Sequence, residues 1–579
     1  MIRAAYGSVS RARDSLTLRA PSFPTTAVEV RDKILWILYA WIEMFTDVFS
    51  FWTEKVWGYV STPTKESILR KQLDEAKSYH EWEELSYKLD SILGNDIWRQ
   101  NPVSRKYDYR LISTRLKELV AARDNRNIEL LMDRLRSGLL RNIGSIASTH
   151  LYNRAYSGTK LLIEDYINVV IQCLEYVERG GRPLTASASK IPNGGEPPSP
   201  RTYHKPMITR QRKLNFFNDT RQSFGSTAVV LHGGSLFGLC HIGMIKTLFN
   251  QGLLPRIVCG STVGALVASL VCSCVDEEVY ETLDNVSSEM SPLRQGYTDI
   301  KYHSVAEGVI SSMCPPEILI FEQYIREKLG DLTFEEAYQR TGRILNIPVT
   351  PKAKPGQVAP PVPTLLNYLS SPNVVVWSAA QCSIGTGIIH KKVELLVKGL
   401  DGQLKPYLDA DDIEYTPANQ AVYAADRESP YTRLSELFNV NNYIVSVARP
   451  YFAPILLSDF KYRAAKSFKT RFLKLTRLEL QYRLNQLSQL GLVPPMIQQW
   501  FVDGNIPAGF QVTVVPELPS LIRDIGKVFD SDNIKEKVDY WIKIGERSVW
   551  PVLNIIWARC AIEFVLDDLY HSRRKDELD

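Results

Sequence analysis

The sequence predicts an α/β fold in three layers, built on a mainly parallel sheet, with helical regions before and after this domain. Three observations predict it. Over residues 207–450, short runs of β-branched residues alternate with helical segments, which is the pattern of βαβ units. Two glycine-rich turns in this region each connect a strand-like run to a helix. Residues 64–179 and most of the chain after 450 have the 3.6-residue periodicity of amphipathic helices.

The composition agrees with a folded protein and excludes several other classes. Hydrophobic residues make up 45% and charged residues 23% of the 579 residues, so a disordered or collagen-like chain is excluded. The net charge of +5 is too small over this length to predict nucleic-acid binding, and we expect none. The eight cysteines form no C-x-x-C pair, so we expect no zinc site, no disulfide framework and a reducing compartment.

The N-terminal part is predicted to contain a tail and a helical domain. Residues 1–25 are rich in Ser and Arg and lack the apolar core of a secretory signal, so we expect a disordered tail. A helical domain is expected over 26–180. Its segment 34–57 is highly apolar, and as a helix it would have one narrow polar stripe opposite a wide aromatic face. Such a helix suits a membrane interface, and a core helix of the domain is the alternative.

A breaker-rich linker over 181–206 precedes the α/β domain, which is expected over 207–450. Strands are predicted over 228–231, 256–259, 373–377 and 442–447, with insertions over 347–363 and 401–427. The extension over 451–579 is expected to be mainly helical, with a closing helix near 550–570 and an appended strand over 511–515. Its segment 460–480 carries seven Lys and Arg among apolar residues, typical of a lipid-binding amphipathic helix or of a solvated surface helix.

The second glycine turn, Gly260-Ser261-Thr262-Val263-Gly264, follows a predicted strand and precedes an apolar helix. We interpret it as a G-x-S-x-G elbow with Ser261 as the nucleophile. Glycines are needed because so tight a turn is expected to hold the serine in a strained backbone conformation. The turn also places the hydroxyl at a helix N-terminus, where the helix dipole stabilises a developing negative charge.

The first glycine turn, residues 233–238 (GGSLFG), lies at the end of the preceding predicted strand. Backbone N–H groups in such a turn converge on an anion, here the oxyanion of a tetrahedral intermediate. We expect the oxyanion hole to use the N–H groups of Gly233, Gly234, Ser235 and Thr262. A nucleotide phosphate is the alternative ligand, which the elbow in the next unit makes the weaker interpretation.

These turns and the His241-Ile242-Gly243 run between them resemble the patatin-like phospholipase family. The stretches 231–269 and 434–454, and the helical region before them, are similar to its fungal triacylglycerol lipase branch. The resemblance implies that a Ser–Asp dyad hydrolyses acyl esters without a catalytic histidine, a metal or a cofactor. It implies that Ser261 is the nucleophile.

The dyad's aspartate is where this chain departs from the family, in which that Asp is usually followed by Gly. Asp503 is followed by Gly504, but it lies beyond the stretch that the fungal branch places after its catalytic Asp. Asp426 lies directly before that stretch, with Arg427 in the place of Gly. We therefore predict Asp426 as the base, and we expect the neighbouring guanidinium to lower its basicity and the activity.

Histidines offer two alternatives to the dyad. His390 and His571 are the late histidines that could complete a triad of the α/β-hydrolase kind. His571 and Asp576 also have the H-x4-D spacing of glycerolipid acyltransferases, in a C-terminal tail with a disordered composition.

The resemblance implies a serine acyl hydrolase that acts on triacylglycerol and phospholipid at the surface of lipid droplets or of the endoplasmic reticulum. A lysophospholipid acyltransferase side activity and a catalytically weak lipid-droplet scaffold are the alternatives. The sequence indicates no oligomeric state.

Overall fold

The computed structural model describes residues 65–180, 209–234, 237–293, 316–352, 362–386, 390, 392–407, 413–416, 429–448, 479, 482–483, 486, 510–518 and 533–578. The chain divides into two units, Met1–Thr62 and Pro63–Asp579. The first unit, with the predicted interface helix over 34–57, lies outside the described residues, as does nearly all of the predicted basic helix over 460–480. All described helices and strands belong to the second unit.

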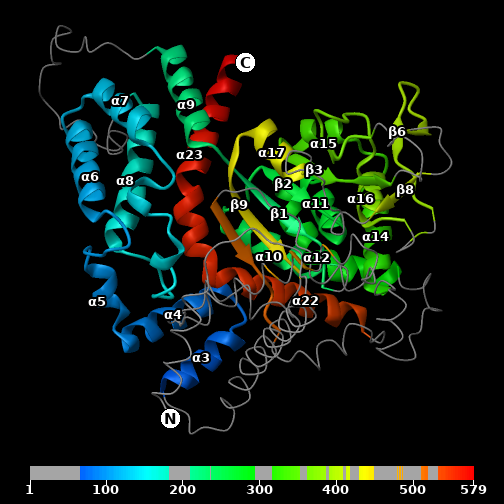
Figure 1. Ribbon diagram of the computed structural model, residues 1–579, viewed down its shortest axis with the longest axis horizontal. Coiled ribbons are helices and arrows are strands. Elements are labelled where there is room, and N and C mark those ends of the chain that lie inside the picture. Colours follow the sequence, from blue (N-terminus) through cyan, green and yellow to red (C-terminus); the bar gives the residue numbers. More distant parts are fainter. Residues whose placement is uncertain are drawn as a thin grey trace, which may run out of the picture. The chain divides into compact units, whose positions relative to one another are not determined.

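A six-stranded sheet in the order β10-β9-β1-β2-β3-β5 lies at the core of the second unit (Figure 1). Its strands are β1 Ser226–His232, β2 Ile257–Gly260, β3 Ile344–Pro348, β5 Leu365–Leu366, β9 Val440–Val447 and β10 Phe510–Val514. Neighbouring strands are parallel, except that β3 and β5 are antiparallel. The described residues also form two antiparallel pairs, β4 Thr350–Lys352 with β8 Glu414–Thr416 and β6 Leu396–Lys398 with β7 Leu404–Pro406. The prediction of a mainly parallel sheet is confirmed.

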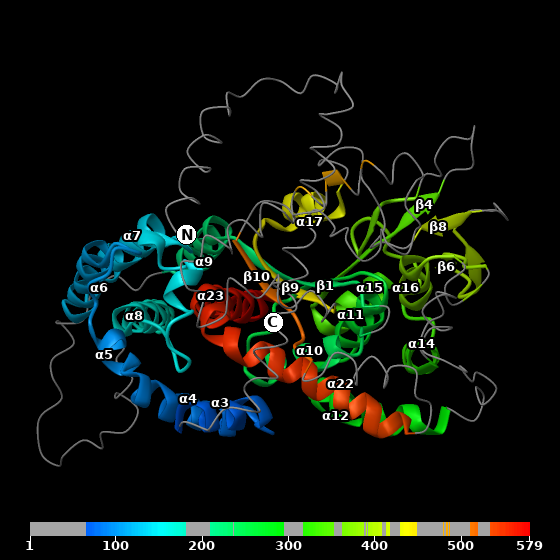
Figure 2. The same cartoon turned by 60° about the horizontal axis from the view of Figure 1, so that its bottom comes forward.

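Both faces of this sheet are buried, because successive side chains of a strand point to opposite sides. In β1, Ala228 and Val230 pack in one apolar cluster with Tyr431, while Val229 belongs to the larger core on the other face. On the first face lies α17 Pro430–Phe438, and on the second lie α10 Cys240–Asn250, α11 Val263–Ser273, α12 Asp276–Leu293 and α22 Ile534–Val549 (Figure 2). Helices α14 Pro316–Leu329 and α15 Phe334–Thr341 contact α11. The three-layer prediction is confirmed.

The region before the sheet is helical, as predicted. It comprises α3 Lys65–Glu75, α4 Tyr79–Leu93, α5 Asn95–Gln100, α6 Tyr109–Asp124, α7 Ile128–Gly138, the short η1 Ile143–Ser145 and η2 Thr149–Leu151, α8 Leu161–Glu178 and α9 Arg210–Phe224. The side chains of Ser78, Asp108 and Asn127 accept hydrogen bonds from backbone N–H groups of the helices that they precede. Each cap satisfies a donor that has no partner within its helix, which defines where α4, α6 and α7 begin.

The C-terminal helix α23, Leu553–Leu578, connects the N-terminal helices to the sheet and contacts both α8 and α9 (Figure 1, red). Glu563 of this helix is buried and accepts hydrogen bonds from the N–H of Thr227 in β1 at 2.6 Å and from Arg141 at 3.0 Å. The Arg141 guanidinium also donates to the carbonyl of Arg559 at 2.6 Å. A buried ion pair therefore joins residues that are 422 positions apart in the sequence.

The prediction is wrong for two segments in the middle of the domain. Residues 373–377 do not form a strand, because α16 Val376–Ile384 begins among them and only Val374 and Val375 form isolated bridges. Strand β3 is not predicted, and its last residues belong to the segment 347–363 that we interpreted as an insertion. Short apolar runs fit a buried strand and a buried helix equally well, so their periodicity does not distinguish the two.

Two further corrections concern the C-terminal part. The run over 511–515 is not appended to the domain, because β10 pairs in parallel with β9 and belongs to the main sheet. The last residues are not a disordered tail, because α23 continues to Leu578. In the part of the chain that the structure describes, one stretch, Ile534–Arg574, is long and apolar enough to cross a membrane, but most of it is buried within the fold.

Candidate active site

The two glycine turns lie side by side at the carboxyl ends of β1 and β2, which are neighbouring parallel strands. The N–H of Gly264 donates a hydrogen bond to the carbonyl of Gly233 at 3.3 Å, which links the turns directly. The approach of the two turns requires glycine at Gly238, where an added side-chain carbon would lie 2.4 Å from Cγ1 of Val263. Within the first turn, Gly234 has φ +101°, and an added side-chain carbon there would lie 2.6 Å from the Cα of Gly238.

The strained residue of the second turn is Thr262. In the pentapeptide 260–264, Ser261 is the second residue, and Thr262 holds the middle position that serine holds in G-x-S-x-G. Thr262 has φ 54° and ψ −122°, whereas Ser261 is not among the residues with positive φ. A β-branched residue at positive φ is a rare conformation that costs about 1–3 kcal/mol. The prediction that Ser261 is in the strained elbow position is therefore wrong, because the structure puts Thr262 there.

Ser261 instead forms hydrogen bonds that link the second turn to the first turn and to the end of β1. Its side chain is buried, and its N–H donates to the carbonyl of Leu231 at 2.9 Å. Its Oγ accepts a hydrogen bond from the N–H of Gly233 at 3.1 Å and lies 3.4 Å from the Leu231 carbonyl oxygen. These contacts are those of a residue that positions the first glycine turn. A nucleophilic role for Ser261 stays a prediction.

The hydroxyl of Thr262 lies in an unusual environment. Thr262 is 4% exposed, and its Oγ1 has no hydrogen-bond partner among the described residues. Buried hydroxyl groups normally have a partner, so this exception requires an explanation. The next residue, Val263, is the first of α11, so the hydroxyl lies at the N-terminus of an 11-residue helix. The helix dipole favours negative charge at this point.

The backbone donors for an oxyanion differ from the predicted set. The N–H of Gly233 donates to Ser261, and the N–H of Thr262 donates to the Oγ of Ser383 in α16 at 3.2 Å. Among the described residues, the N–H groups of Gly234 and Val263 have no hydrogen-bond partner. Ser235 lies outside the described residues.

Val263 is a candidate donor that the sequence analysis did not name. In an elbow the oxyanion receives a hydrogen bond from the N–H of the residue after the nucleophile. With Ser261 as the nucleophile, the residue after it is Thr262. With Thr262 in the elbow position, the residue after it is Val263. Counting the residues of the pentapeptide from Gly260 to Gly264 is the signal that identifies both positions.

The two histidines beside the first turn connect it to neighbouring elements. His232 Nδ1 lies 3.1 Å from the hydroxyl of Tyr431 in α17, and His241 Nδ1 lies 2.8 Å from the Oγ of Ser446 in β9. Complete burial lowers the pKa of His241 to about 3, so its ring is neutral at physiological pH.

The late histidines are held elsewhere. His390 Nε2 lies 3.2 Å from the carboxylate of Glu322 in α14. His571 and Asp576 both lie in α23, and a separation of five helical positions places them about 140° apart around the helix axis. The described contacts do not bring either histidine to the glycine turns, and no group of His, Cys, Asp and Glu among the described residues could hold a metal ion.

Both candidate bases, Asp426 and Asp503, lie outside the described residues. The strand after Asp503, predicted to be appended to the domain, is β10 of the main sheet. Asp426 stays the predicted base, and the pairing of β10 removes one reason for preferring it to Asp503.

The chain is similar to known proteins over most of its length. Residues 229–410 match the patatin-like phospholipase family, and residues 59–222 match a domain of unknown function, DUF3336. Triacylglycerol lipase ptl1 of Schizosaccharomyces pombe is 32% identical over 547 residues, which cover 91% of this chain and 92% of that protein. Triacylglycerol lipase 3 of Saccharomyces cerevisiae is 28% identical over 639 residues, with coverages of 92% and 94%.

One solved structure is also similar, the type III effector protein ExoU. It is 14% identical, with a TM-score of 0.24 over 58% of this chain and 53% of that chain. So low a score carries no argument about this site.

Proposed function

Because the chain belongs to the patatin-like phospholipase family, we propose that it is a triacylglycerol lipase whose nucleophilic hydroxyl comes from the turn 260–264. The names of its relatives in two yeasts, which match it over more than nine-tenths of its length, support this activity. The observation that carries the mechanism is the strained Thr262 at the start of α11. We therefore assign the attack to Thr262 Oγ1, with Ser261 as the rival from the same turn.

The reaction has two steps. Thr262 Oγ1 attacks the acyl carbonyl carbon while a base takes the hydroxyl proton, and the N–H groups of Gly234 and Val263 stabilise the oxyanion. Collapse of this intermediate breaks the ester bond, and the departing diacylglycerol oxygen takes the proton from the base. Water then attacks the acyl-enzyme in the same way and releases the fatty acid.

The predicted Ser–Asp dyad assigns the base role to an aspartate, and the family resemblance supports that class of residue. Asp426 is a candidate because it directly precedes the stretch that the fungal branch places after its catalytic Asp. Asp503 is a candidate because Gly504 follows it, as in most of the family. Neither the neutral, buried His241 nor His232 is needed for this chemistry, since both already bind neighbouring elements.

We place this activity at the surface of lipid droplets or of the endoplasmic reticulum, with phospholipid as a second substrate. Triacylglycerol gathers in such lipid phases, and the predicted aromatic face of segment 34–57 is suited to their interface. Deleting residues 34–57 should move a fluorescent fusion from droplets into the cytosol. A fusion that stays on droplets would assign the anchor to another segment, with 460–480 as the next to test.

Three variants of the purified protein test the mechanism by fatty-acid release from a triacylglycerol emulsion. Thr262→Ala should reduce release to background, because the nucleophile is lost. Thr262→Ser should keep the activity or raise it, because it retains the hydroxyl and removes the β-branch that strains the turn. Ser261→Ala should cost about tenfold, the effect of losing one hydrogen bond to the first glycine turn.

The opposite pattern, with Ser261→Ala inactive and Thr262→Ala active, would restore Ser261 as the nucleophile. Wild-type protein that releases no fatty acid would favour the scaffold alternative. Acyl transfer that depends on an added lysophospholipid would favour the acyltransferase alternative.

A further inference from the structure

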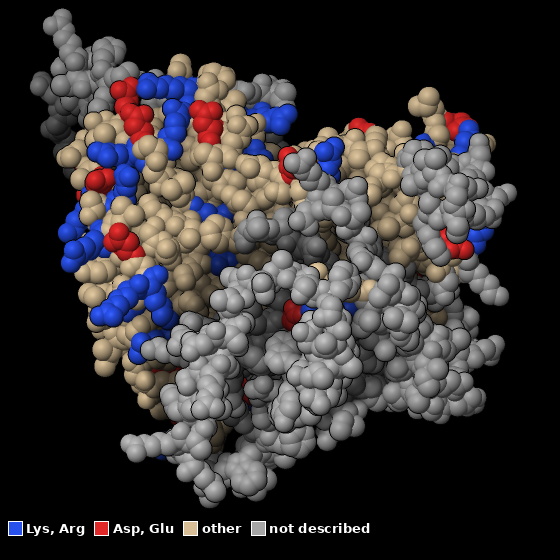
Figure 3. Space-filling model, viewed as in Figure 1, with Lys and Arg blue, Asp and Glu red and all other residues tan. Residues whose placement is uncertain are grey.

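A surplus of basic side chains is concentrated on α6, α7 and the loop before them. Residues 105–136 contain nine Lys and Arg against five Asp and Glu, all at least partly exposed. The net charge of this segment, +4, is nearly as large as the net charge of +5 of the whole chain. In Figure 3, basic side chains gather over this region at the left of the view. We call residues 105–136 the basic face.

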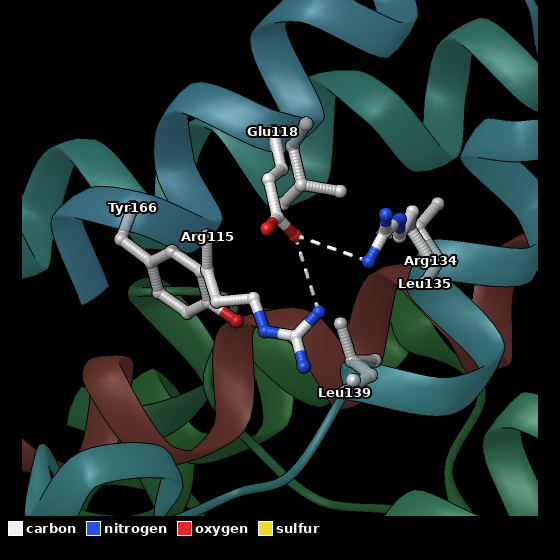
Figure 4. Close-up of a pocket in the computed structure, with 8 residues that line it drawn as sticks. Arg115, Glu118, Arg134, Leu135, Leu139 and Tyr166 are labelled. Atoms are coloured by element: carbon white, nitrogen blue, oxygen red, sulfur yellow. Dashed lines mark hydrogen bonds and ion pairs between the residues drawn. The ribbon is translucent and has the colours of Figure 1, made fainter. Parts of the chain in front are cut away.

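Two arginines of the basic face share one carboxylate oxygen beside a small pocket (Figure 4). Arg115 Nη1 and Arg134 Nη1 lie 3.3 and 3.4 Å from Glu118 Oε2. Because one carboxylate faces two guanidinium groups, one positive charge is left uncompensated. The pocket is walled by leucines and Tyr166, and its volume of about 10 Å³ admits one oxygen-sized group but no acyl chain.

We propose that the basic face docks on an anionic phospholipid surface, with a headgroup phosphate oxygen in the pocket between Arg115 and Arg134. A phosphate oxygen meets both requirements of the pocket, small size and negative charge. The proposal rests on the proposed function for the presence of a lipid surface, but docking itself requires no hydrolysis.

Exposed apolar side chains favour a lipid surface over nucleic acid, which offers the same phosphates. Val103, in the loop before α6, is 58% exposed, and Leu130, at the start of α7, is 42% exposed. At a membrane surface such side chains enter the boundary with the acyl chains while neighbouring cations contact the headgroups. A nucleic-acid backbone offers them no comparable environment.

Vesicle co-sedimentation of the full-length protein tests the proposal. We compare vesicles of pure phosphatidylcholine with vesicles of equal parts phosphatidylcholine and phosphatidic acid. The double variant Arg115→Gln/Arg134→Gln should bind the anionic vesicles about 30-fold more weakly, since each basic residue at an anionic surface contributes about fivefold. Glu118→Gln should bind several-fold more tightly, because it removes the carboxylate that competes with the headgroup.

Lys328→Gln/Arg340→Gln is the matched control, since it removes two paired, similarly exposed cations from α14 and α15. It should bind like the wild type, and thermal melting should show that both double variants are folded. Equal losses in the two double variants, or no loss in the first, would overturn the proposal, as would binding to a duplex oligonucleotide but not to anionic vesicles. Thr262→Ala should bind vesicles normally, so a failure of the lipase mechanism and a failure of docking are distinguishable.

Discussion

Acidification is expected to destabilise the protein through His241, a fully buried residue of α10 that contacts Ser446 of β9. Burial, with a smaller contribution from the nearby His232, lowers the pKa of His241 to about 3. In the unfolded chain a histidine has a pKa of about 6.5. Below that pH the unfolded state therefore binds a proton that the folded state does not, and stability falls as the pH falls.

The size of this effect follows from the difference between the two pKa values. Each pH unit below about 6.5 costs about 1.4 kcal/mol, until the folded pKa near 3 is reached. Moving from pH 7 to pH 5 should therefore remove about 2 kcal/mol of unfolding free energy through this one side chain.

Urea denaturation followed by tryptophan fluorescence at the two pH values measures the loss. In His241→Gln the loss between pH 7 and pH 5 should be smaller than in the wild type by about 2 kcal/mol, because glutamine does not titrate. His80→Gln is the control, since the His80 side chain is 80% exposed on α4, and it should lose as much as the wild type. Equal losses in the wild type and in His241→Gln would refute the reasoning.

Two other predictions concern the buried ion pair and the base. Arg141→Met leaves the carboxylate of Glu563 buried without its cation, so thermal denaturation should show a loss of about 3–5 kcal/mol in unfolding free energy. Most of this loss should be recovered in Arg141→Met/Glu563→Leu. A loss below about 1 kcal/mol in the single variant would contradict this account. Asp426→Asn should reduce the rate of fatty-acid release at least ~100-fold if Asp426 is the base, while Asp503→Asn should have little effect. The reverse result would assign the base to Asp503. Full activity in both variants would exclude both residues as the base.

The sequence by itself determined the features that depend on neighbouring residues. The 3.6-residue periodicity of the N-terminal region predicted its helices, and the β-branched runs before the glycine turns predicted β1 and β2. The turns were predictable because a glycine between a strand and a helix reports a local need for close backbone approach, as at Gly234. Family membership also followed from these local motifs.

Tertiary structure decided what depends on residues far apart in the chain. Only strand pairing shows that β10 belongs to the main sheet, because the sequence of its five residues does not indicate which strand they will hydrogen-bond to. Only the backbone angles show that the strain of the elbow lies on Thr262, while Ser261 binds the first turn through Gly233. The surplus charge of residues 105–136 is present in the sequence, but folding α6 against α7 is what brings Arg115 and Arg134 to the same carboxylate oxygen. The physical reason is common to all three: a local pattern sets backbone preference, whereas long-range contacts depend on which surfaces the whole chain buries together.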